Sequence, residues 1–89
     1  MANDLTGNPW VIDTAAVITT GPATVLKSEW QEPTAADDLT ILDNGGNTIY
    51  DDNAIAGGSG IRLEVKIAGQ MNGFNVSVID GGTLYVYVK

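Results

Sequence analysis

The chain has 89 residues and a formal charge of −7, so it has room for one domain with a small core. It contains neither histidine nor cysteine, which excludes disulfides, thiolate metal sites and mechanisms that pair a nucleophile with histidine. The acidic balance repels nucleic-acid phosphates and anionic membranes, so we expect neither as a partner. We also expect no enzymatic activity, no cofactor and no bound metal.

Residues 1–8 are polar and are predicted to form a flexible N-terminal arm of a single domain that spans residues 1–89. The arm lacks the basic and apolar regions of a signal peptide, and no stretch of the chain reaches the ~20 apolar residues of a membrane span. We therefore expect a protein that is made and kept in the cytosol unless an assembly carries it elsewhere.

Two short apolar runs follow the arm. Residues 9–12 are predicted to form a strand that begins at a proline, which strand starts and sheet edges tolerate. Residues 16–20 are a second strand candidate, predicted to end at the turn-forming dipeptide Gly21-Pro22. An alternative is that both runs belong to one irregular edge strand with a bulge.

The next segment, residues 23–31, has the alternation of a strand, which predicts that Leu26 and Trp30 face the core. Residues 32–38 are polar and contain a proline, so they are predicted to form a loop. A single helical turn capped by Thr34 is the alternative for this loop.

The strongest hairpin signal of the chain lies between residues 39–42 and residues 47–50. The two runs flank Asp43-Asn44-Gly45-Gly46, which are residues that tolerate positive φ. We therefore predict two antiparallel strands joined by this turn. A flexible, glycine-rich connection over residues 51–60 is predicted to follow them.

Residues 60–69 carry the clearest strand pattern, because branched apolar residues alternate with mostly charged ones. This alternation predicts a half-buried strand that the rest of the chain covers. The predicted inner set is Ile61, Leu63, Val65 and Ile67, and the predicted outer set is Arg62, Glu64, Lys66 and Ala68.

A turn at residues 70–73 is predicted to lead into a strand at residues 74–78, and a turn at residues 80–82 into a last strand at residues 83–88. The whole chain thus presents about seven short strands separated by Gly, Pro, Asn and Asp turns, with no helical period. These features predict an all-β fold, a small antiparallel β-sandwich or a partly closed barrel.

The last predicted strand is apolar on both faces. Its inner face is predicted to hold Leu84, Val86 and Val88, which leaves Tyr85 and Tyr87 pointing outward. Tyrosine is enriched in the desolvated centres of interfaces, so we expect this outer face to meet another protein or another copy of the chain. The alternative is burial under the N-terminal segment or cross-strand stacking.

Two other sets of residues suggest ligands less strongly. Carboxylates at strand ends are hard ligands for Ca²⁺, but their spacing is not that of an EF-hand, so we interpret them as solvated turn residues. Aromatic side chains form a sugar-stacking platform in some proteins, but in a small sandwich they are more often core or interface. The acidic set is Asp37, Asp38, Asp43, Asp51 and Asp52, and the aromatic set is Trp10, Trp30, Tyr50, Tyr85 and Tyr87.

Residues 6–15, Thr-Gly-Asn-Pro-Trp-Val-Ile-Asp-Thr-Ala, and residues 82–87, Gly-Thr-Leu-Tyr-Val-Tyr, resemble small virion-associated proteins of tailed bacteriophages. The resemblance implies a non-enzymatic virion structural protein, made in the host cytoplasm and placed on the capsid exterior as a decoration or cement protein. It implies the major capsid protein or another virion protein as partner, and a homo-oligomer. The alternative is a carbohydrate- or surface-binding module of a head or tail fibre.

Within that interpretation, two parts of the chain are expected to make protein contacts. The segment formed by Pro9, Trp10, Val11 and Ile12 is expected to pair with the sheet edge of a neighbour. The face formed by Tyr85 and Tyr87 is expected to make the contact between copies.

Overall fold

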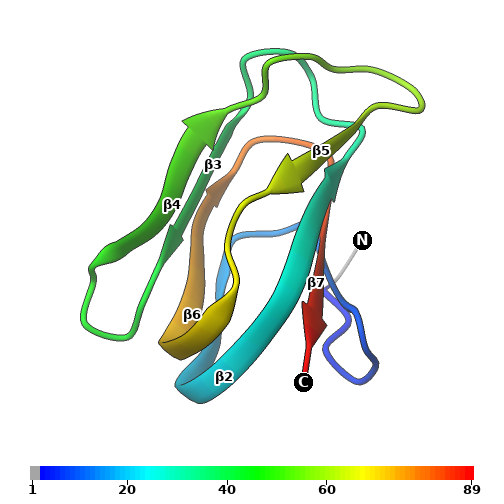
Figure 1. The fold of residues 1–89 in the computed structure, drawn as a ribbon. Helices are drawn as coiled ribbons and strands as arrows, with labels where there is room; N and C mark the ends of the chain where they lie inside the picture. The colour runs from blue at the N-terminus through cyan, green and yellow to red at the C-terminus, as the bar shows by residue number, and fades with distance from the viewer. Residues whose placement is uncertain (1–2) are drawn as a thin grey trace.

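The computed structural model describes residues 3–89, which contain seven strands and no helix (Figure 1). All strands belong to one antiparallel sheet with the order β1-β7-β2-β6-β3-β4, and β5 pairs with β2 beside this path. The predicted antiparallel all-β fold is confirmed, and the sheet is not closed into a barrel. The strands are β1 (Trp10–Ile12), β2 (Ala16–Gln31), β3 (Asp38–Leu42), β4 (Thr48–Asn53), β5 (Arg62–Val65), β6 (Gly69–Ile79) and β7 (Thr83–Val88).

Strand β2 is the element that joins the two halves of the fold. Its first part pairs with β6, from Ala16 opposite Val76 to Val25 opposite Gly69. Its last part lies between β7 and β5. Both β2 and β6 curve strongly where the sheet bends (Figure 1). The bend produces two leaves. The β7 leaf is made of β1, β7, β5 and the last part of β2. The β3 leaf is made of β3, β4, β6 and the first part of β2.

The core lies between the two leaves and is closed by their inward-facing side chains. Trp30 and Phe74 are its largest fully buried members. The ring of Trp10 meets Phe74 edge-on, with ring centroids 6.0 Å apart. The buried apolar residues are Ile12, Val25, Trp30, Leu39, Ile41, Ala54, Val65, Ile67, Phe74, Val76, Leu84 and Val86.

The predicted end of a strand at Gly21-Pro22 is wrong, because β2 continues through this dipeptide to Gln31. Pro22 lies opposite Asn72 next to a register shift, and this part of β2 has a partner on one side only, so the missing N–H costs no ladder bond. The predicted turn at residues 70–73 is also wrong, since these residues belong to β6. The proposed merger of residues 9–12 and 16–20 into one edge strand is wrong too, because β1 pairs with β7 and β2 with β6.

Leu26 is 55% exposed, so its predicted place in the core is wrong, whereas the prediction for Trp30 is confirmed at 1% exposure. The cause is a bulge in β2. Val25 lies opposite Val88, and the next paired residue, Lys27, lies opposite Tyr87, so Leu26 is an additional residue in the ladder. The extra residue inverts the alternation before it, so Val25 is buried in place of Leu26, whereas Ser28 and Trp30 are buried as the alternation predicts.

The alternation predicted for residues 60–69 is confirmed, with Val65 and Ile67 buried and Glu64 and Lys66 exposed. The strand is shorter than predicted and lies at an edge of the sheet, since β5 ends at Val65 and pairs with β2 alone. It ends there because the Ile67 amide donates to the Val65 carbonyl at 2.8 Å, a three-residue turn that leaves the ladder.

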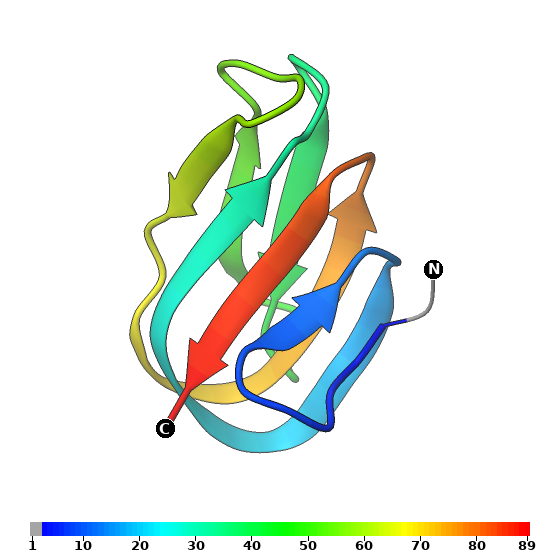
Figure 2. The ribbon, with the colours of Figure 1, turned by 90° about the vertical axis from the view of Figure 1, so that its right-hand side faces the viewer.

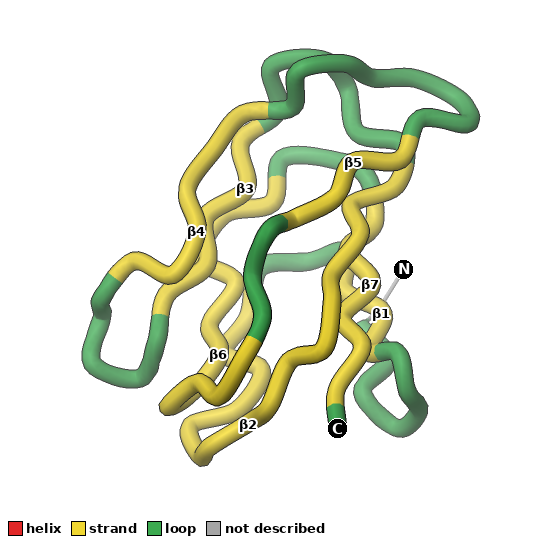
Figure 3. Tube along the Cα trace, in the orientation of Figure 1, coloured by secondary structure: helices red, strands yellow, loops and turns green. Residues whose placement is uncertain are grey.

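The hairpin predicted around residues 43–46 is confirmed as β3 and β4. The Asp43 carboxylate shapes its turn by accepting from the amides of Gly45 and Asn47, each at 2.9 Å. Residues 32–37 form a loop with a turn and no helix, in which Asp37 donates its amide to the Thr34 carbonyl at 2.9 Å, and Asp38 already begins β3. The longest connection, residues 54–61, joins β4 to β5 at one end of the molecule (Figure 3).

Residues 3–8 fold back beside β1 (Figure 2). Asp4 and Val11 exchange two backbone hydrogen bonds of 2.8 Å. The Asn8 side chain accepts from the Val88 amide at 3.0 Å and donates to its carbonyl at 2.6 Å, which continues the β1–β7 ladder by one step. Residues 1–2, part of the predicted flexible arm, lie outside the described residues, and the flexibility of the arm stays a prediction.

Candidate functional site

The outer face of the β7 leaf carries the two tyrosines predicted to make protein contacts. Tyr85 and Tyr87 alternate with the buried Leu84 and Val86, so their partly buried rings lie on the outer surface. Tyr85 lies between Val11 of β1 and Glu29 of β2 in the register of the sheet. Tyr87 faces Lys27, whose ammonium nitrogen is 4.7 Å from the ring centre.

Of the predicted contact segment, the structure places one side chain with these tyrosines. Ile12 is fully buried, and Trp10 packs on Phe74, so both point into the core. Pro9 precedes the strand and is partly buried. Both edges of β1 are occupied within the chain, by β7 on one side and by Asp4 on the other. Only Val11 therefore joins Tyr85 and Tyr87 on the outer face. Contact of any of these residues with another protein stays a prediction.

The bulge in β2 adds one residue to this face that the sequence pattern did not indicate. It turns Leu26 outward next to Lys27, which the alternation already directs outward beside Tyr87. Farther along β2, the Gln31 amide donates to the Glu29 carboxylate at 2.6 Å. We call the set Val11, Leu26, Lys27, Tyr85 and Tyr87 the tyrosine face.

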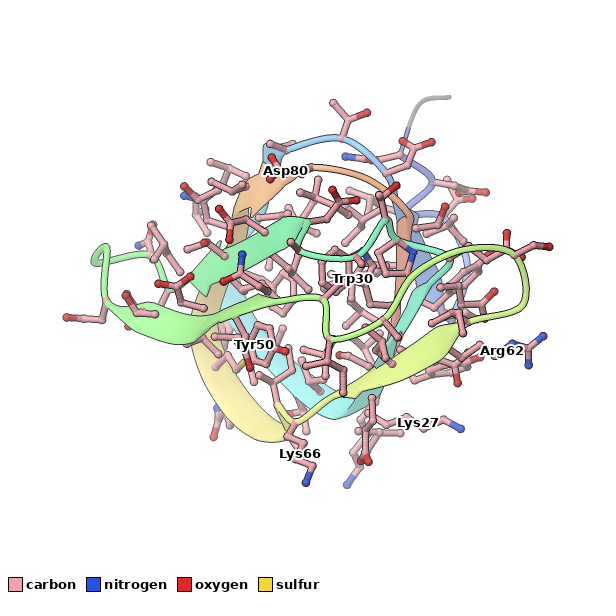
Figure 4. All side chains as sticks on the ribbon, turned by 90° about the horizontal axis from the view of Figure 1, so that it is seen from above. Lys27, Trp30, Tyr50, Arg62, Lys66 and Asp80 are labelled. Atoms are coloured by element: carbon pink, nitrogen blue, oxygen red, sulfur yellow. The ribbon has the colours of Figure 1, made fainter. Side chains whose placement is uncertain are left out.

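The two leaves differ in charge, because the β7 leaf and its adjoining residues carry four cations and five carboxylates and are nearly neutral. The four cationic side chains belong to the β7 leaf or directly follow its strands, whereas the β3 leaf and its adjoining turns carry six carboxylates and no cation. Figure 4 shows Lys27, Arg62 and Lys66 on the side of the molecule opposite Asp80. The cations are Lys27, Arg62, Lys66 and Lys89, and the carboxylates of the β3 leaf are those of Asp37, Asp38, Asp43, Asp51, Asp52 and Asp80.

The carboxylates considered for Ca²⁺ do not converge. Asp43 lies at the end of β3 opposite to Asp37 and Asp38. Within residues 3–89, no group of three or more His, Cys, Asp or Glu side chains is placed to hold a metal ion. Hydrogen bonds from the backbone and side chain of Asn47 lower the pKa of Asp43, which is a turn-stabilising role.

A pocket of about 330 Å³ opens between β4 and β5. These strands follow one another in the chain but do not pair, so the two leaves are not joined at this margin. Tyr50 of β4 and Trp30 near the centre of the molecule both line the pocket (Figure 4). We call this margin the β4–β5 seam, and its pocket is lined by Trp30, Tyr50, Asp52, Asn53, Ile55, Leu63, Glu64 and Lys66.

The aromatic residues considered as a sugar platform are distributed over three places. Trp10 is in the core, Tyr85 and Tyr87 are on the tyrosine face, and only Trp30 and Tyr50 line the seam pocket. The indole nitrogen of Trp30 donates to the Gly81 carbonyl at 2.8 Å, which fixes the ring. Burial, and then the negative charge of Asp52, raise the pKa of Tyr50, so its hydroxyl is a neutral donor at neutral pH.

Comparisons with known proteins returned no match: no family model, no curated protein and no solved structure is similar to this chain. Among residues 3–89 there is also no helix of the length and hydropathy needed to cross a membrane.

Proposed function

We propose that this protein is a non-enzymatic structural protein of a bacteriophage particle, a decoration or cement protein that binds the assembled capsid through the tyrosine face. The tyrosine face is the observation that carries the proposal, together with the resemblance of residues 6–15 and 82–87 to small phage virion proteins. Two partly buried tyrosines beside an exposed leucine on a sheet surface fit a protein interface, because tyrosine is enriched at interface centres.

The division of charge supports one orientation on the particle. The β7 leaf, with all the cations, faces the capsid, and the acidic β3 leaf faces the solvent. Six carboxylates on the outer side repel neighbouring particles and keep them dispersed. Leu26 and Tyr87, which are costly to expose to water, are covered in this orientation.

The mechanism in this proposal is preferential binding to the closed lattice. A protein that binds the assembled shell and not the free subunits stabilises the shell by mass action. Contacts that span adjacent subunits, repeated over many copies, add avidity without new chemistry. The result is resistance of the shell to rupture by internal pressure.

The test begins with purified particles of the phage that encodes the chain. Mass spectrometry gives the copy number, and a cryo-EM reconstruction gives the position. The proposal expects a copy number that matches symmetry-related sites on the capsid surface, with the β7 leaf inward. Absence of the protein from the particles, or a location restricted to the tail, contradicts it.

Variants then test the face itself. Tyr85→Ser combined with Tyr87→Ser is expected to abolish capsid binding of the purified protein and to lower its oligomer size. The matched control combines Asp51→Asn with Asp52→Asn on the opposite leaf, and it is expected to bind like the wild type. Binding that survives the tyrosine double variant, with the fold intact by circular dichroism, overturns the role of this face.

A further inference from the structure

We infer that the β4–β5 seam is a docking site for an extended segment of another protein, which pairs as an added strand with the free edge of β5 and places an apolar side chain in the pocket. This site is separate from the tyrosine face, and the inference does not rest on the proposed function.

The backbone of β5 has one unpaired side. In the β2–β5 ladder, the Glu32 amide donates to the Ile61 carbonyl at 2.7 Å. The pair Trp30 and Leu63 lies two residues farther along the same ladder, so it is also a hydrogen-bonded pair. Because hydrogen-bonded and non-hydrogen-bonded residues alternate in an antiparallel pair, the amides and carbonyls of Arg62 and Glu64 point away from β2. No strand within residues 3–89 pairs with that side. An exposed edge of this kind is a template for another strand.

The facing edge, β4, is less suited to a new strand. The Asn53 amide is already bonded to the Asp52 carboxylate at 2.8 Å. The Asn53 side chain donates to the Ala36 carbonyl at 3.1 Å and to the Asp38 carboxylate, which ties this end of β4 to its own hairpin. Asp51 and Asp52 also place two charges on the strand, a device that discourages edge pairing. The geometry therefore selects β5 as the receiving edge.

The pocket beside this edge provides a place for an apolar side chain. Trp30, Tyr50 and Leu63 give it an apolar lining, and its volume of about 330 Å³ lies at the lower end of the range for ligand pockets. Ile55 is 88% exposed on the pocket's border. A strand added to β5 directs alternate side chains toward the pocket and covers Ile55, which removes apolar surface from water.

Charge complementarity specifies the rest of the segment. Along the seam, the carboxylates of Asp51, Asp52 and Glu64 outnumber the cations of Arg62 and Lys66 by one. The chain as a whole carries a charge of −7, which attracts basic partners. The fitting occupant is therefore an extended segment in which apolar residues alternate with lysine or arginine.

The probe is a capped synthetic peptide of sequence Lys-Val-Lys-Leu-Lys-Val-Lys, titrated into the isotope-labelled full chain and followed by NMR. We expect shifts at Arg62, Leu63, Glu64 and Tyr50, and slower hydrogen exchange at the Arg62 and Glu64 amides. The same peptide with glutamate in place of lysine is expected to bind at least about tenfold more weakly. Equal binding of the two peptides overturns the charge argument.

Backbone methylation tests strand addition directly. An added strand uses only alternate amides for pairing. Two peptides are therefore compared, one N-methylated at the odd positions and one at the even positions. We expect one of them to lose binding by about tenfold or more and the other to retain it. Loss in both peptides, or in neither, overturns pairing with the edge.

A pair of protein variants gives the matching control. Glu64→Pro and Glu64→Thr both remove the carboxylate, but only the proline removes the outward amide. We expect the proline variant to bind the lysine peptide about tenfold more weakly than the threonine variant. If Glu64→Pro does not fold, the two methylated peptides decide the question. Equal affinities of the two folded variants overturn the inference.

Two further outcomes also overturn the inference. One is a free chain that self-associates with the β5 edge covered, because the occupant is then a second copy. The other is a monosaccharide probe that shifts the pocket resonances while the peptide does not. The Tyr85→Ser and Tyr87→Ser double variant is expected to bind the peptide normally, so failure of capsid binding and failure of seam binding are distinguishable.

Discussion

The ammonium nitrogen of Lys27 lies 4.7 Å from the ring centre of Tyr87, and the two residues face one another across the β2–β7 ladder. A cation over an aromatic face at an exposed site contributes about 0.5–1 kcal/mol. We predict a coupling energy of that size between Lys27→Met and Tyr87→Leu in a double-mutant cycle of urea unfolding. Strictly additive losses would show that the two side chains are only neighbours.

A second prediction concerns two glycines that share a backbone conformation but differ in surroundings. Gly73 has φ of 93°, and a Cβ added there would lie 2.6 Å from Asn44 Cβ. Gly46 has φ of 82°, and nothing lies within 4 Å of its added Cβ. Gly46→Ala is expected to cost about 1 kcal/mol from conformation alone, and Gly73→Ala about 1–3 kcal/mol more.

Thermal or urea unfolding of the two alanine variants measures this difference. The extra loss at Gly73 arises because the backbone of Asn44, 2.8 Å from the added Cβ, has to move, and it is held by a 2.8 Å hydrogen bond to the Asn72 carbonyl. Equal losses of unfolding free energy at the two positions would mean that the backbone at the hairpin tip moves without a cost in stability.

The third prediction concerns Ser28, whose hydroxyl is buried without a hydrogen-bond partner within the described residues. It lies in register between Val65 and Val86, so its surroundings are apolar. Ser28→Ala removes an unsatisfied group and is expected to raise the free energy of unfolding by about 1 kcal/mol. Thr40→Ala is the control, because the Thr40 hydroxyl donates to the Asp51 carboxylate at 3.1 Å. A loss of stability in Ser28→Ala as large as in the control would contradict the prediction.

The fourth prediction concerns pH. Hydrogen bonds from Asn47 hold the pKa of Asp43 below its usual 3.8 in the folded chain. The stabilisation is therefore complete above the unfolded pKa, and it is lost as pH falls through the lower folded pKa. Asp43→Asn is expected to reduce the fall in stability between about pH 5 and about pH 2.

The measurement is urea unfolding across that range, with the carboxyl titration of Asp43 followed by NMR. Thr6 lowers the pKa of Asp4 in the same way, through its hydroxyl and its amide. The free energy of unfolding of Asp43→Asn is therefore expected to keep some dependence on pH. This dependence should become smaller when Asp4→Asn is added. A wild-type titration of Asp43 at or above 3.8 would sink the prediction.

Features that depend on neighbouring residues in the chain were predictable from sequence. The turn at residues 43–46 needs a residue with positive φ, and the local sequence places Gly46 at that position. The outward direction of Tyr85 and Tyr87 follows from alternation alone. The strand periods of β5 and β7 and the all-β class were correct for the same reason.

Features set by distant partners were not predictable. The bulge that exposes Leu26 exists only in the ladder with β7, nearly sixty residues later in the chain. Leu26 lies beside Lys27 on the outer face only because of that bulge. The seam was also missed, because β4 and β5 are consecutive strands, and consecutive strands usually pair. Its pocket depends on a pairing that is absent, and no local pattern encodes such an absence.

The position of β7 inside the sheet has a consequence for the order of events during synthesis. β7 lies between β1 and β2, so residues 83–88 complete two ladders whose other strands are made much earlier. While the ribosome is still adding these residues, Trp10 lacks its partner strand, and Trp30 has β5 on one side and no strand on the other. Contacts over such long separations form slowly and leave apolar surface open in the meantime. The two ladders with β7 therefore form only after residues 83–88 are made, and until then the acidic side chains of the nascent chain oppose its aggregation.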